Sequence, residues 1–300
     1  MTKSNMKIFI SFLFFFILKV SFSQTLYLDK VSNVSKRTYT YQKTKNHKKL
    51  KLDFYKPKKI KGKLPLLLYV HGGGFSGGKR NDENTVNFSK NMAARGYAVA
   101  SISYRLTMKN LGFGCNTKSN DKIKAFNAAS KDISLAVQYL LKKQRKLSLD
   151  TRKVILVGTS AGAEAILNLV YVNKGKNLPK GFKFAGVISM AGAITSIDYI
   201  TKETAVPTQL FHGTNDQLVP YHIAAHHYCK SDSEGYLVLY GSKAIANKLK
   251  KIEQSFYLYT INKGDHSWSG KPMQLCKTEI LDFLYYDVLK KQKRQINLTI

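Results

Sequence analysis

A serine between glycines follows an apolar run near the middle of the chain. The run "KVILVG" at 153–158 leads through "GTSAG" at 158–162 into the helix-like stretch "AEAILNLVY". A polar residue at this point extends a buried strand poorly, but it presents one hydroxyl at a sharp turn between a strand and a helix. The sequence therefore predicts that Ser160 is a nucleophile.

A serine hydroxyl needs a neighbouring base, and histidine is the usual one. His266, in "NKGDHSW", follows the last predicted strand, where a base would reach the carboxyl edge of a sheet. The other histidines are assigned to strand ends with structural roles (His71, His212), a basic hairpin (His47) and a predicted helix (His222, His226, His227). The helical group has a spacing that could bind a metal, but no matching carboxylate accompanies it, so no metal site is predicted.

The histidine in turn needs a carboxylate that orients it. Asp216, in "FHGTNDQLVP", follows the strand before the one that carries His266. Asp198 is the second candidate because it follows the preceding strand, whereas Asp265 adjoins His266 too closely to reach its ring. The predicted chain order is therefore Ser160, Asp216, His266.

Acyl transfer also requires donors for a developing oxyanion. The stretch "HGGGF" at 71–75 follows the apolar run "LLLYV", and its glycines allow backbone N–H groups to face a substrate oxygen. We predict Gly73 and Gly74 as donors from this loop and Ala161 as the donor beside Ser160. A phosphate-binding loop is the competing interpretation, but the run lacks both G-x-G-x-x-G and GK[ST].

The elements around these residues alternate between strands and helices from residue 64 onward. Continuous apolar runs predict strands covered on both faces, and "TYTYQK" and "KLKLDFYKP" predict two antiparallel edge strands before them. This pattern indicates an α/β fold with a mostly parallel central sheet and helices on both faces. We expect a single domain over 37–295.

The first residues have the features of an export signal. Basic residues precede an apolar run of 11 residues, and small residues stand before a possible cut after Ser23. A membrane-spanning helix needs about 20 residues, so we predict a signal peptide over 1–23 and no stable membrane insertion after cleavage. A mobile leader is expected over 24–36, and the mature protein is expected to be secreted or periplasmic.

The net charge of +31 suggests anionic partners. However, 42 of the 49 basic residues are lysine and only seven are arginine, which is the residue that nucleic-acid interfaces favour. The lysines are spread along the chain, and no nucleic-acid motif is present. A solvated lysine-rich surface is therefore the prediction, with no nucleic-acid partner.

Three cysteines, Cys115, Cys229 and Cys276, leave at least one thiol unpaired, and the sequence does not decide which two form a disulfide.

The stretch 107–124 is polar and contains glycine, so it predicts a loop that lines an open, wet cleft. No apolar helical insert that could form a lid interrupts the motifs.

Together these motifs resemble the α/β-hydrolase esterases of the HGGG type, near hormone-sensitive-lipase-like carboxylesterases and the bacterial feruloyl-esterase-like (BD-FAE-like) hydrolases. The shared pieces are "LDFYKP", "LLLYVHGGGFSGG", "RGYAVASISYRL", "VILVGTSAGA", "FHGTNDQLVPY" and "GDHSW", and they cover roughly residues 50–290. After "SYRL" many relatives continue with an acidic, proline-containing segment, where this chain has "TMKNLGFGCNTKSN".

The resemblance implies a serine hydrolase of carboxylic esters that needs no cofactor. Together with the polar loop and the export signal, it favours small-molecule or glycan esters with short acyl groups, such as acetyl or feruloyl esters of glycans. A prolyl-oligopeptidase-like peptidase, a formamidase-like amide hydrolase and a non-catalytic binding module remain alternatives. The sequence gives no oligomeric state.

Overall fold

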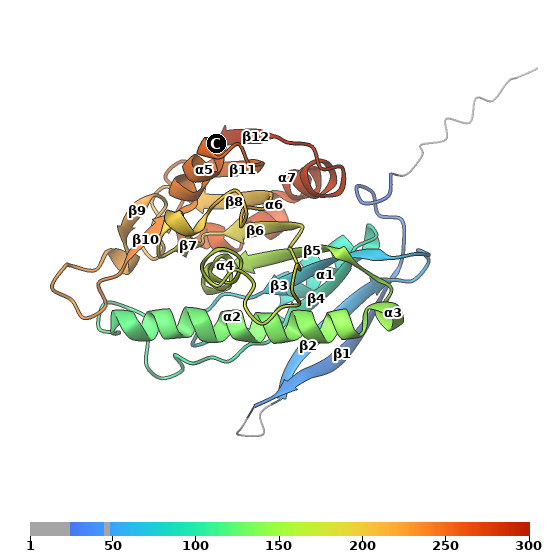
Figure 1. The fold of residues 1–300 in the computed structure, drawn as a ribbon, viewed down its shortest axis with the longest axis horizontal. Coiled ribbons are helices and arrows are strands. Elements are labelled where there is room, and N and C mark those ends of the chain that lie inside the picture. Colours follow the sequence, from blue (N-terminus) through green and yellow to red (C-terminus); the bar gives the residue numbers. More distant parts are fainter. Residues whose placement is uncertain (1–24, 45–48) are drawn as a thin grey trace, which may run out of the picture.

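The computed structural model describes residues 25–44 and 49–300. Its centre is a nine-stranded sheet in the order β1-β2-β4-β3-β5-β6-β8-β11-β12 (Figure 1). The strands of this sheet are β1 (Val34–Lys43), β2 (Lys49–Pro57), β3 (Leu64–Val70), β4 (Ala98–Ile102), β5 (Leu149–Thr159), β6 (Gly186–Met190), β8 (Thr208–Gly213), β11 (Phe256–Ile261) and β12 (Gln295–Thr299).

Strand direction divides this sheet into two parts. β1 pairs antiparallel with β2, and β2 pairs antiparallel with β4. All pairings from β4 through β3, β5, β6, β8 and β11 to β12 are parallel. The prediction of a mostly parallel sheet preceded by two antiparallel strands is confirmed, and the chain has the α/β-hydrolase fold.

Helices cover both faces of the sheet, because its central strands have apolar side chains on both faces. The helices are α1 (Glu83–Ala94), α2 (Ser119–Lys142), α3 (Gln144–Leu147), α4 (Ala161–Leu167), α5 (Ser242–Lys251), α6 (Pro272–Leu275) and α7 (Lys277–Asp282). α4 continues into a π-helical turn over Asn168–Val172, and α7 continues into another over Phe283–Leu289. Figure 1 shows α2 running along one face.

β3 shows how one strand serves two cores. Leu66 and Leu68 are buried in the core cluster that includes α2, α4 and α5, whereas Leu67 and Tyr69 belong to the cluster that includes α1 and α7. Successive side chains of a strand point to opposite faces, so a fully apolar strand needs helices on both sides. The burial of all seven β3 residues confirms the strand predicted from this run.

A second, three-stranded antiparallel sheet lies beside the main one. It joins β7 (Ala193–Ile194), β10 (Val238–Gly241) and β9 (Ile223–Ala225). The helix predicted around His222, His226 and His227 is therefore wrong: the segment forms β9 followed by a single 3₁₀ turn over His226–Tyr228.

The predicted domain limits need correction at both ends. Residues 25–33, assigned to a mobile leader over 24–36, contact α1: the Tyr27 N–H donates to the Arg95 carbonyl at 2.8 Å, and the Tyr27 ring packs 5.2 Å from the Tyr97 ring. β1 then begins at Val34, before the predicted start at 37. At the other end, β12 pairs with β11, so the sheet continues past residue 295.

The predicted signal peptide over 1–23 lies outside the described residues. Within residues 25–44 and 49–300, no helix has the length and apolar character needed to cross a membrane.

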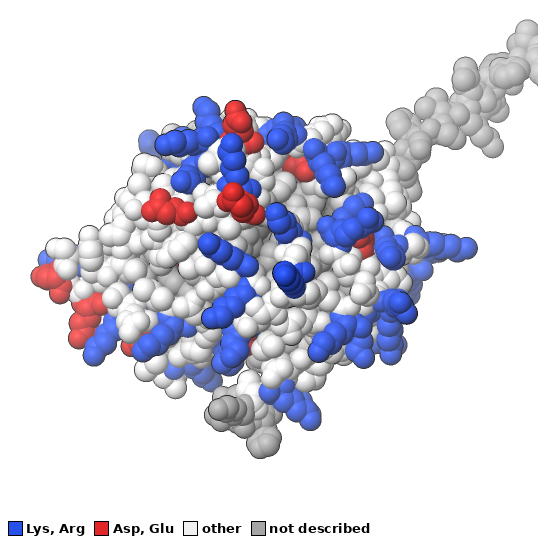
Figure 2. All heavy atoms as spheres, viewed as in Figure 1, with Lys and Arg blue, Asp and Glu red and all other residues white. Residues whose placement is uncertain are grey.

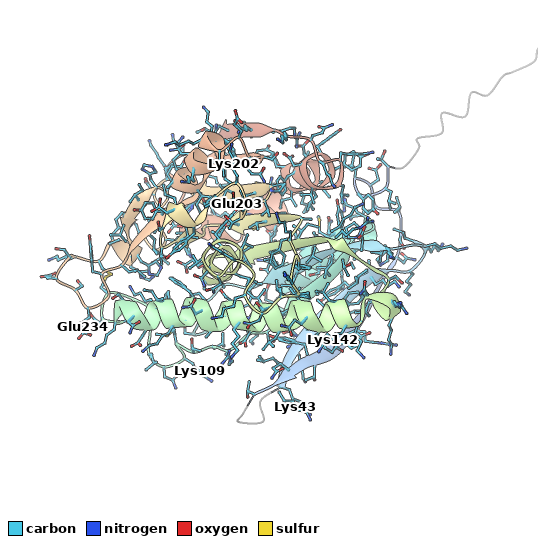
Figure 3. All side chains as sticks on the ribbon, viewed as in Figure 1. Lys43, Lys109, Lys142, Lys202, Glu203 and Glu234 are labelled. Atoms are coloured by element: carbon cyan, nitrogen blue, oxygen red, sulfur yellow. A yellow bond between two sulfur atoms is a disulfide. The ribbon has the colours of Figure 1, made fainter. Side chains whose placement is uncertain are left out.

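Basic side chains are spread over the face shown in Figure 2 rather than gathered in one patch. Lys and Arg cover much of the visible face, with fewer Asp and Glu among them (Figure 2). Lys43 at the end of β1, Lys109 before α2 and Lys142 at the end of α2 all have exposed side chains (Figure 3).

Candidate active site

Ser160 stands at a tight turn between β5 and α4. Its backbone has φ 49° and ψ −125°, a sparsely populated conformation for a residue with a side chain. A Cβ added at Gly158 would lie 2.6 Å from the Gly162 carbonyl oxygen, and one added at Gly162 would lie 2.2 Å from the Val70 carbonyl oxygen. Both glycines are therefore required for the strand and helix to approach, which explains the "GTSAG" spacing.

The structure brings together the three residues predicted for the catalytic group. Ser160 Oγ lies 2.9 Å from His266 Nε2, and His266 Nδ1 lies 2.7 Å from Asp216 Oδ2. Asp216 follows β8 and His266 opens a 3₁₀ turn (His266–Ser269) after β11, and these two strands are parallel neighbours. Because their carboxyl ends meet at one edge of the sheet, residues 50 positions apart come into contact.

Asp216 is fully buried, and its two oxygens have different partners. Oδ1 accepts the backbone N–H groups of Leu218 and Val219, each at 2.9 Å. Oδ2 faces His266 and also His212, whose Nε2 is 3.3 Å away. Burial raises the pKa of Asp216, but hydrogen bonds from His212 and His266 outweigh it and hold that pKa well below its usual range. The carboxylate is thus ionised and can orient His266.

The sequence did not reveal that His212 would contact Asp216. His212 lies on β8 with its ring buried, and its Nδ1 lies 2.8 Å from Ser242 Oγ. Its position near the end of the strand that precedes Asp216 is the signal that could have suggested this contact, since the two residues are four positions apart.

The other acidic candidates lie elsewhere. Asp198 is exposed and accepts a hydrogen bond from Ser196 Oγ, and Asp265 is exposed and caps the turn that begins with His266. Neither carboxylate contacts the imidazole, so of the acids considered from the sequence only Asp216 meets the histidine.

The glycine loop after β3 contains backbone N–H groups free to bind an oxygen atom. Gly73 and Gly74 have φ values of 109° and 57°, which side chains rarely permit. Among the described residues, the N–H groups of Gly73, Gly74 and Ala161 donate to no acceptor. A Cβ added at Gly72 would lie 3.0 Å from Ser160 Cβ, so the loop passes directly beside Ser160.

His71, which opens this loop, has a structural position. The Tyr104 hydroxyl donates to the His71 carbonyl at 2.9 Å, and the two rings stack at 4.5 Å. Burial lowers the pKa of His71.

A hollow of about 410 Å³ opens beside this loop and is lined by Gly72, Gly73 and Thr159 together with other residues.

The stretch 107–124 differs from the predicted polar loop. α2 already begins at Ser119, and Met108 and Phe113 are buried. The Phe113 ring packs 5.0 Å from the Phe75 ring, and a Cβ added at Gly74 would lie 3.7 Å from Phe113 Cβ. A buried aromatic side chain thus stands beside the glycine loop, and only the part of the stretch before Ser119 is a loop. The apolar character of Phe113 was hidden among polar neighbours in the sequence.

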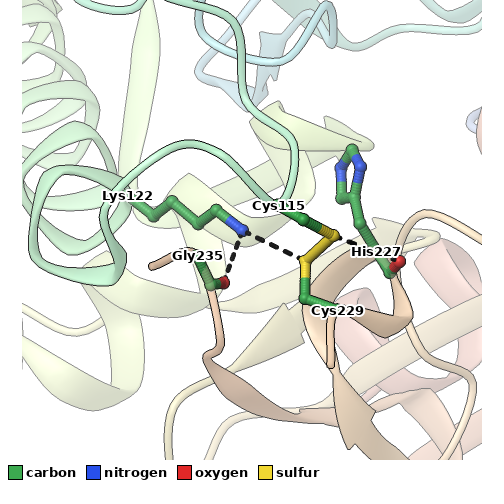
Figure 4. The surroundings of a disulfide bond; sticks show 5 residues. All are labelled: Cys115, Lys122, His227, Cys229 and Gly235. Atoms are coloured by element: carbon green, nitrogen blue, oxygen red, sulfur yellow. Dashed lines mark hydrogen bonds between the residues drawn. A yellow bond between two sulfur atoms is a disulfide. The ribbon is translucent and has the colours of Figure 1, made fainter. Parts of the chain in front are cut away.

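A disulfide between Cys115 and Cys229 fastens this stretch to the turn after β9, with the Cα atoms 5.2 Å apart (Figure 4). Cys276 is a buried free thiol. The structure thus resolves the pairing that the sequence left open.

In the part of the chain that the structure describes, no three His, Cys, Asp or Glu side chains are grouped as a metal site.

Comparisons with known proteins agree with this architecture. The BD-FAE family matches residues 52–185, a little under half of the chain. Esterase B1 of Culex pipiens is 29% identical over 140 residues, which are 47% of this chain and 24% of that protein. The chain thus spans about a quarter of the length of this curated relative.

Solved structures share the fold at low sequence identity. A thermophilic esterase of Thermogutta terrifontis, Est2 with butyrate bound, superposes with a TM-score of 0.61 at 18% identity, covering 85% of this chain and 94% of that one. Brefeldin A esterase, a bacterial homologue of human hormone-sensitive lipase, gives a TM-score of 0.61 at 15% identity, covering 91% of this chain and 81% of the other. The chain therefore shares the α/β-hydrolase fold of these enzymes. Its residues 52–185 are similar to the BD-FAE family.

Proposed function

We propose that this protein is a serine hydrolase of carboxylic esters. The observation that carries the proposal is the continuous contact from Ser160 Oγ through the His266 ring to the Asp216 carboxylate, at 2.9 and 2.7 Å. A buried, ionised carboxylate keeps the proton on His266 Nδ1, which leaves Nε2 free to accept the serine proton.

The proposed reaction has two halves. Ser160 Oγ attacks the ester carbonyl while His266 Nε2 takes its proton, and the oxyanion binds the N–H groups of Gly73, Gly74 and Ala161. The intermediate then expels the alcohol, which takes the proton back from His266. Water then attacks the acyl-enzyme while His266 Nε2 takes its proton. The second intermediate expels Ser160 Oγ, which receives that proton from His266, and the carboxylic acid is released. No cofactor takes part in this proposal.

Short acyl groups are the proposed substrates, including acetyl or feruloyl esters of glycans met outside the cytoplasm after cleavage of the signal peptide at Ser23. Phe113 supports the limit on acyl length, because a Cβ added at Gly74 would lie 3.7 Å from Phe113 Cβ, so a bulky aromatic residue adjoins the glycine loop. The butyrate and propionate complexes of the Thermogutta terrifontis esterase support it further, since that enzyme shares this fold. The export part rests on the sequence of residues 1–23.

A substrate panel tests the proposal. Nitrophenyl esters from acetate to decanoate are compared with peptide nitroanilides and an aryl formamide, using the mature chain. Turnover of the esters at rates far above those of the amides supports an esterase. Faster cleavage of the nitroanilides or of the formamide would instead support the peptidase or the amidase, and no turnover of any substrate would support a binding module.

A further inference from the structure

Two ionisable side chains are buried together next to the nucleophile helix. Glu164 lies on α4, and its backbone N–H donates to the Ser160 carbonyl at 3.0 Å. Its side chain is 2% exposed, and Oε1 lies 3.4 Å from Nε2 of His226, which is 1% exposed. Among the described residues, neither Glu164 Oε1 nor His226 Nδ1 makes a hydrogen bond. A polar pair buried at such a cost in hydration calls for a functional explanation.

The pair is connected to the glycine loop through one aromatic ring. The His226 ring meets the Phe113 ring edge to face, with centroids 5.2 Å apart. Phe113 in turn packs against Phe75 and approaches Gly74. An unbroken series of contacts therefore runs from α4, which carries Ala161, to the loop that carries Gly73 and Gly74.

A covalent link joins the two segments that carry the middle members of this series, Phe113 and His226. Cys115 follows Phe113 by two residues, Cys229 follows His226 by three, and the two cysteines form the disulfide (Figure 4). The buried Lys122 of α2 also contacts the segment that carries Cys229. Its Nζ donates to the Gly235 carbonyl at 2.8 Å and lies 4.0 Å from Cys229 Sγ.

The backbone between His226 and Cys229 is strained. His227 and Tyr228 have φ values of 58° and 51°, and two consecutive non-glycine residues rarely adopt this conformation. Such a turn persists only where its surroundings hold it. Here the His227 N–H donates to the Leu218 carbonyl at 2.8 Å, two residues beyond Asp216, so the turn also adjoins the segment that orients His266.

We propose that Glu164 and His226 are positioning residues for the oxyanion hole. They hold Phe113, and through it the glycine loop, at a fixed distance from the N–H group of Ala161. We call these contacts from Glu164 through His226 to Phe113 the brace. The Cys115–Cys229 disulfide stabilises the brace by linking the segments that carry Phe113 and His226. The inference rests on the proposed esterase function and adds to it residues that touch neither substrate nor reacting atoms.

The charge states of the pair are compatible with a brace. Burial raises the pKa of Glu164 to about 8, with the Asp216 charge adding to this effect and Lys122 opposing it. Burial also lowers the pKa of His226 well below its ordinary value, and the neighbouring His227 and Lys122 act in the same direction. At neutral pH the carboxyl therefore carries the proton and the imidazole is neutral, so the brace needs no buried charge.

The first test compares Glu164→Ala with Glu164→Gln, using the full mature chain and nitrophenyl acetate. Removing an oxyanion donor costs about 100- to 1,000-fold in kcat, so a misplaced donor in Glu164→Ala is expected to cost about 10- to 100-fold. KM should stay within about twofold, because ground-state binding does not use the oxyanion hole. Glu164→Gln keeps the shape and a polar contact to His226, and should retain most of kcat.

Inhibition by a transition-state analogue distinguishes a positioning role from a merely structural one, because it reports directly on binding in the oxyanion hole. A trifluoromethyl ketone forms a tetrahedral adduct with the serine and places an oxyanion in the hole. Glu164→Ala should weaken its inhibition by about the same factor as kcat, while inhibition by the product carboxylate stays unchanged. Asp287→Asn is the matched control: Asp287 is buried and bonded to Ser255 and Arg294 near β12, so it should lose stability without loss of kcat.

The disulfide gives an independent arm in case Glu164→Ala fails to fold. The double variant Cys115→Ser/Cys229→Ser should show the same fall in kcat at nearly constant KM, and the wild type treated with a reductant should match it. The brace would be overturned if the wild type cleaves nitrophenyl acetate but Glu164→Ala and Cys115→Ser/Cys229→Ser keep the wild-type kcat. It would also be overturned if their kcat falls only as far as that of Asp287→Asn. A wild type without esterase activity would overturn the proposed function and the brace with it.

Discussion

Asp216 Oδ2 is shared by two imidazoles: His266 Nδ1 lies 2.7 Å away and His212 Nε2 lies 3.3 Å away. The His212 ring is fixed on its other side by Ser242 Oγ and also lies 3.1 Å from the Val219 carbonyl. His212 therefore limits the positions that the carboxylate can take, and through it the orientation of the proposed base.

His212→Gln tests this relationship. The variant should retain the Ser160–His266 contact but leave the Asp216 carboxylate less firmly held, so we expect kcat to fall by about tenfold, well short of the loss on removing a triad member. Steady-state kinetics on nitrophenyl acetate provide the measurement. A loss as large as that of Asp216→Asn would show that His212 takes part in the chemistry itself.

Asp216→Asn and Asp198→Asn distinguish the two acids considered from the sequence. An amide at 216 would favour the wrong imidazole tautomer, an effect of about ten-thousand-fold on kcat in serine proteases. Asp198 is exposed and bonded to Ser196, so its variant should match the wild type. If Asp198→Asn proves the more damaging change, the proposed acid is wrong.

Asp216 should also link stability to pH. Its pKa in the folded protein lies below the unfolded value of 3.8, so the stability that it contributes is present above pH 3.8 and is lost as pH falls through the folded pKa. Denaturant unfolding of the wild type and Asp216→Asn should therefore show a difference at pH 7 that narrows below pH 3.8. A constant difference over the whole range would argue against an ionised Asp216.

Glu164 should act in the opposite direction. Its pKa is raised from 4.5 to about 8, so the folded state binds the proton more tightly than the unfolded state, and stability falls as pH rises between these values. Glu164→Gln cannot ionise, so the stability of the variant relative to wild type should increase from pH 5 to pH 9. Urea unfolding at pH 5, 7 and 9 measures this. A relative stability that decreases with pH would mean that Glu164 is buried as a stabilised anion.

Phe113 should limit acyl length. We expect higher kcat/KM on acetate and butyrate esters than on decanoate, and Phe113→Ala should raise the ratio of decanoate to acetate turnover by opening space beside Gly74. Leu111→Ala, at an exposed residue of the same stretch, is the control and should leave the profile unchanged. Preference of the wild type for decanoate would contradict the short-acyl proposal.

The sequence predicted the positions of Ser160, Asp216 and His266 because each depends on local order along the chain. A parallel sheet places the loops after its strands at one edge, so a polar residue after each apolar run is enough to bring them together. The "GTSAG" turn was equally predictable, since only glycine permits the close approaches at positions 158 and 162.

Contacts between distant segments left no such local signal. Glu164 and His226 are 62 residues apart and belong to a helix and a strained turn, and neither the pairing of Cys115 with Cys229 nor the burial of Phe113 follows from a period of two or 3.6 residues. Residues 25–33 likewise resembled a leader because their packing on α1 depends on a few side chains such as Tyr27. Such features depend on tertiary packing that a single sequence does not encode locally.

Covalent capture of Ser160 tests the central claim most directly. The mature wild type and Ser160→Ala are treated with a fluorophosphonate, and intact mass and peptide mapping locate the adduct, with turnover of nitrophenyl acetate measured in parallel. We predict a single adduct on the peptide that contains Ser160, none on the variant, and a loss of turnover of about five to six orders of magnitude. An adduct on another residue, or turnover by Ser160→Ala near the wild-type rate, would contradict the proposal.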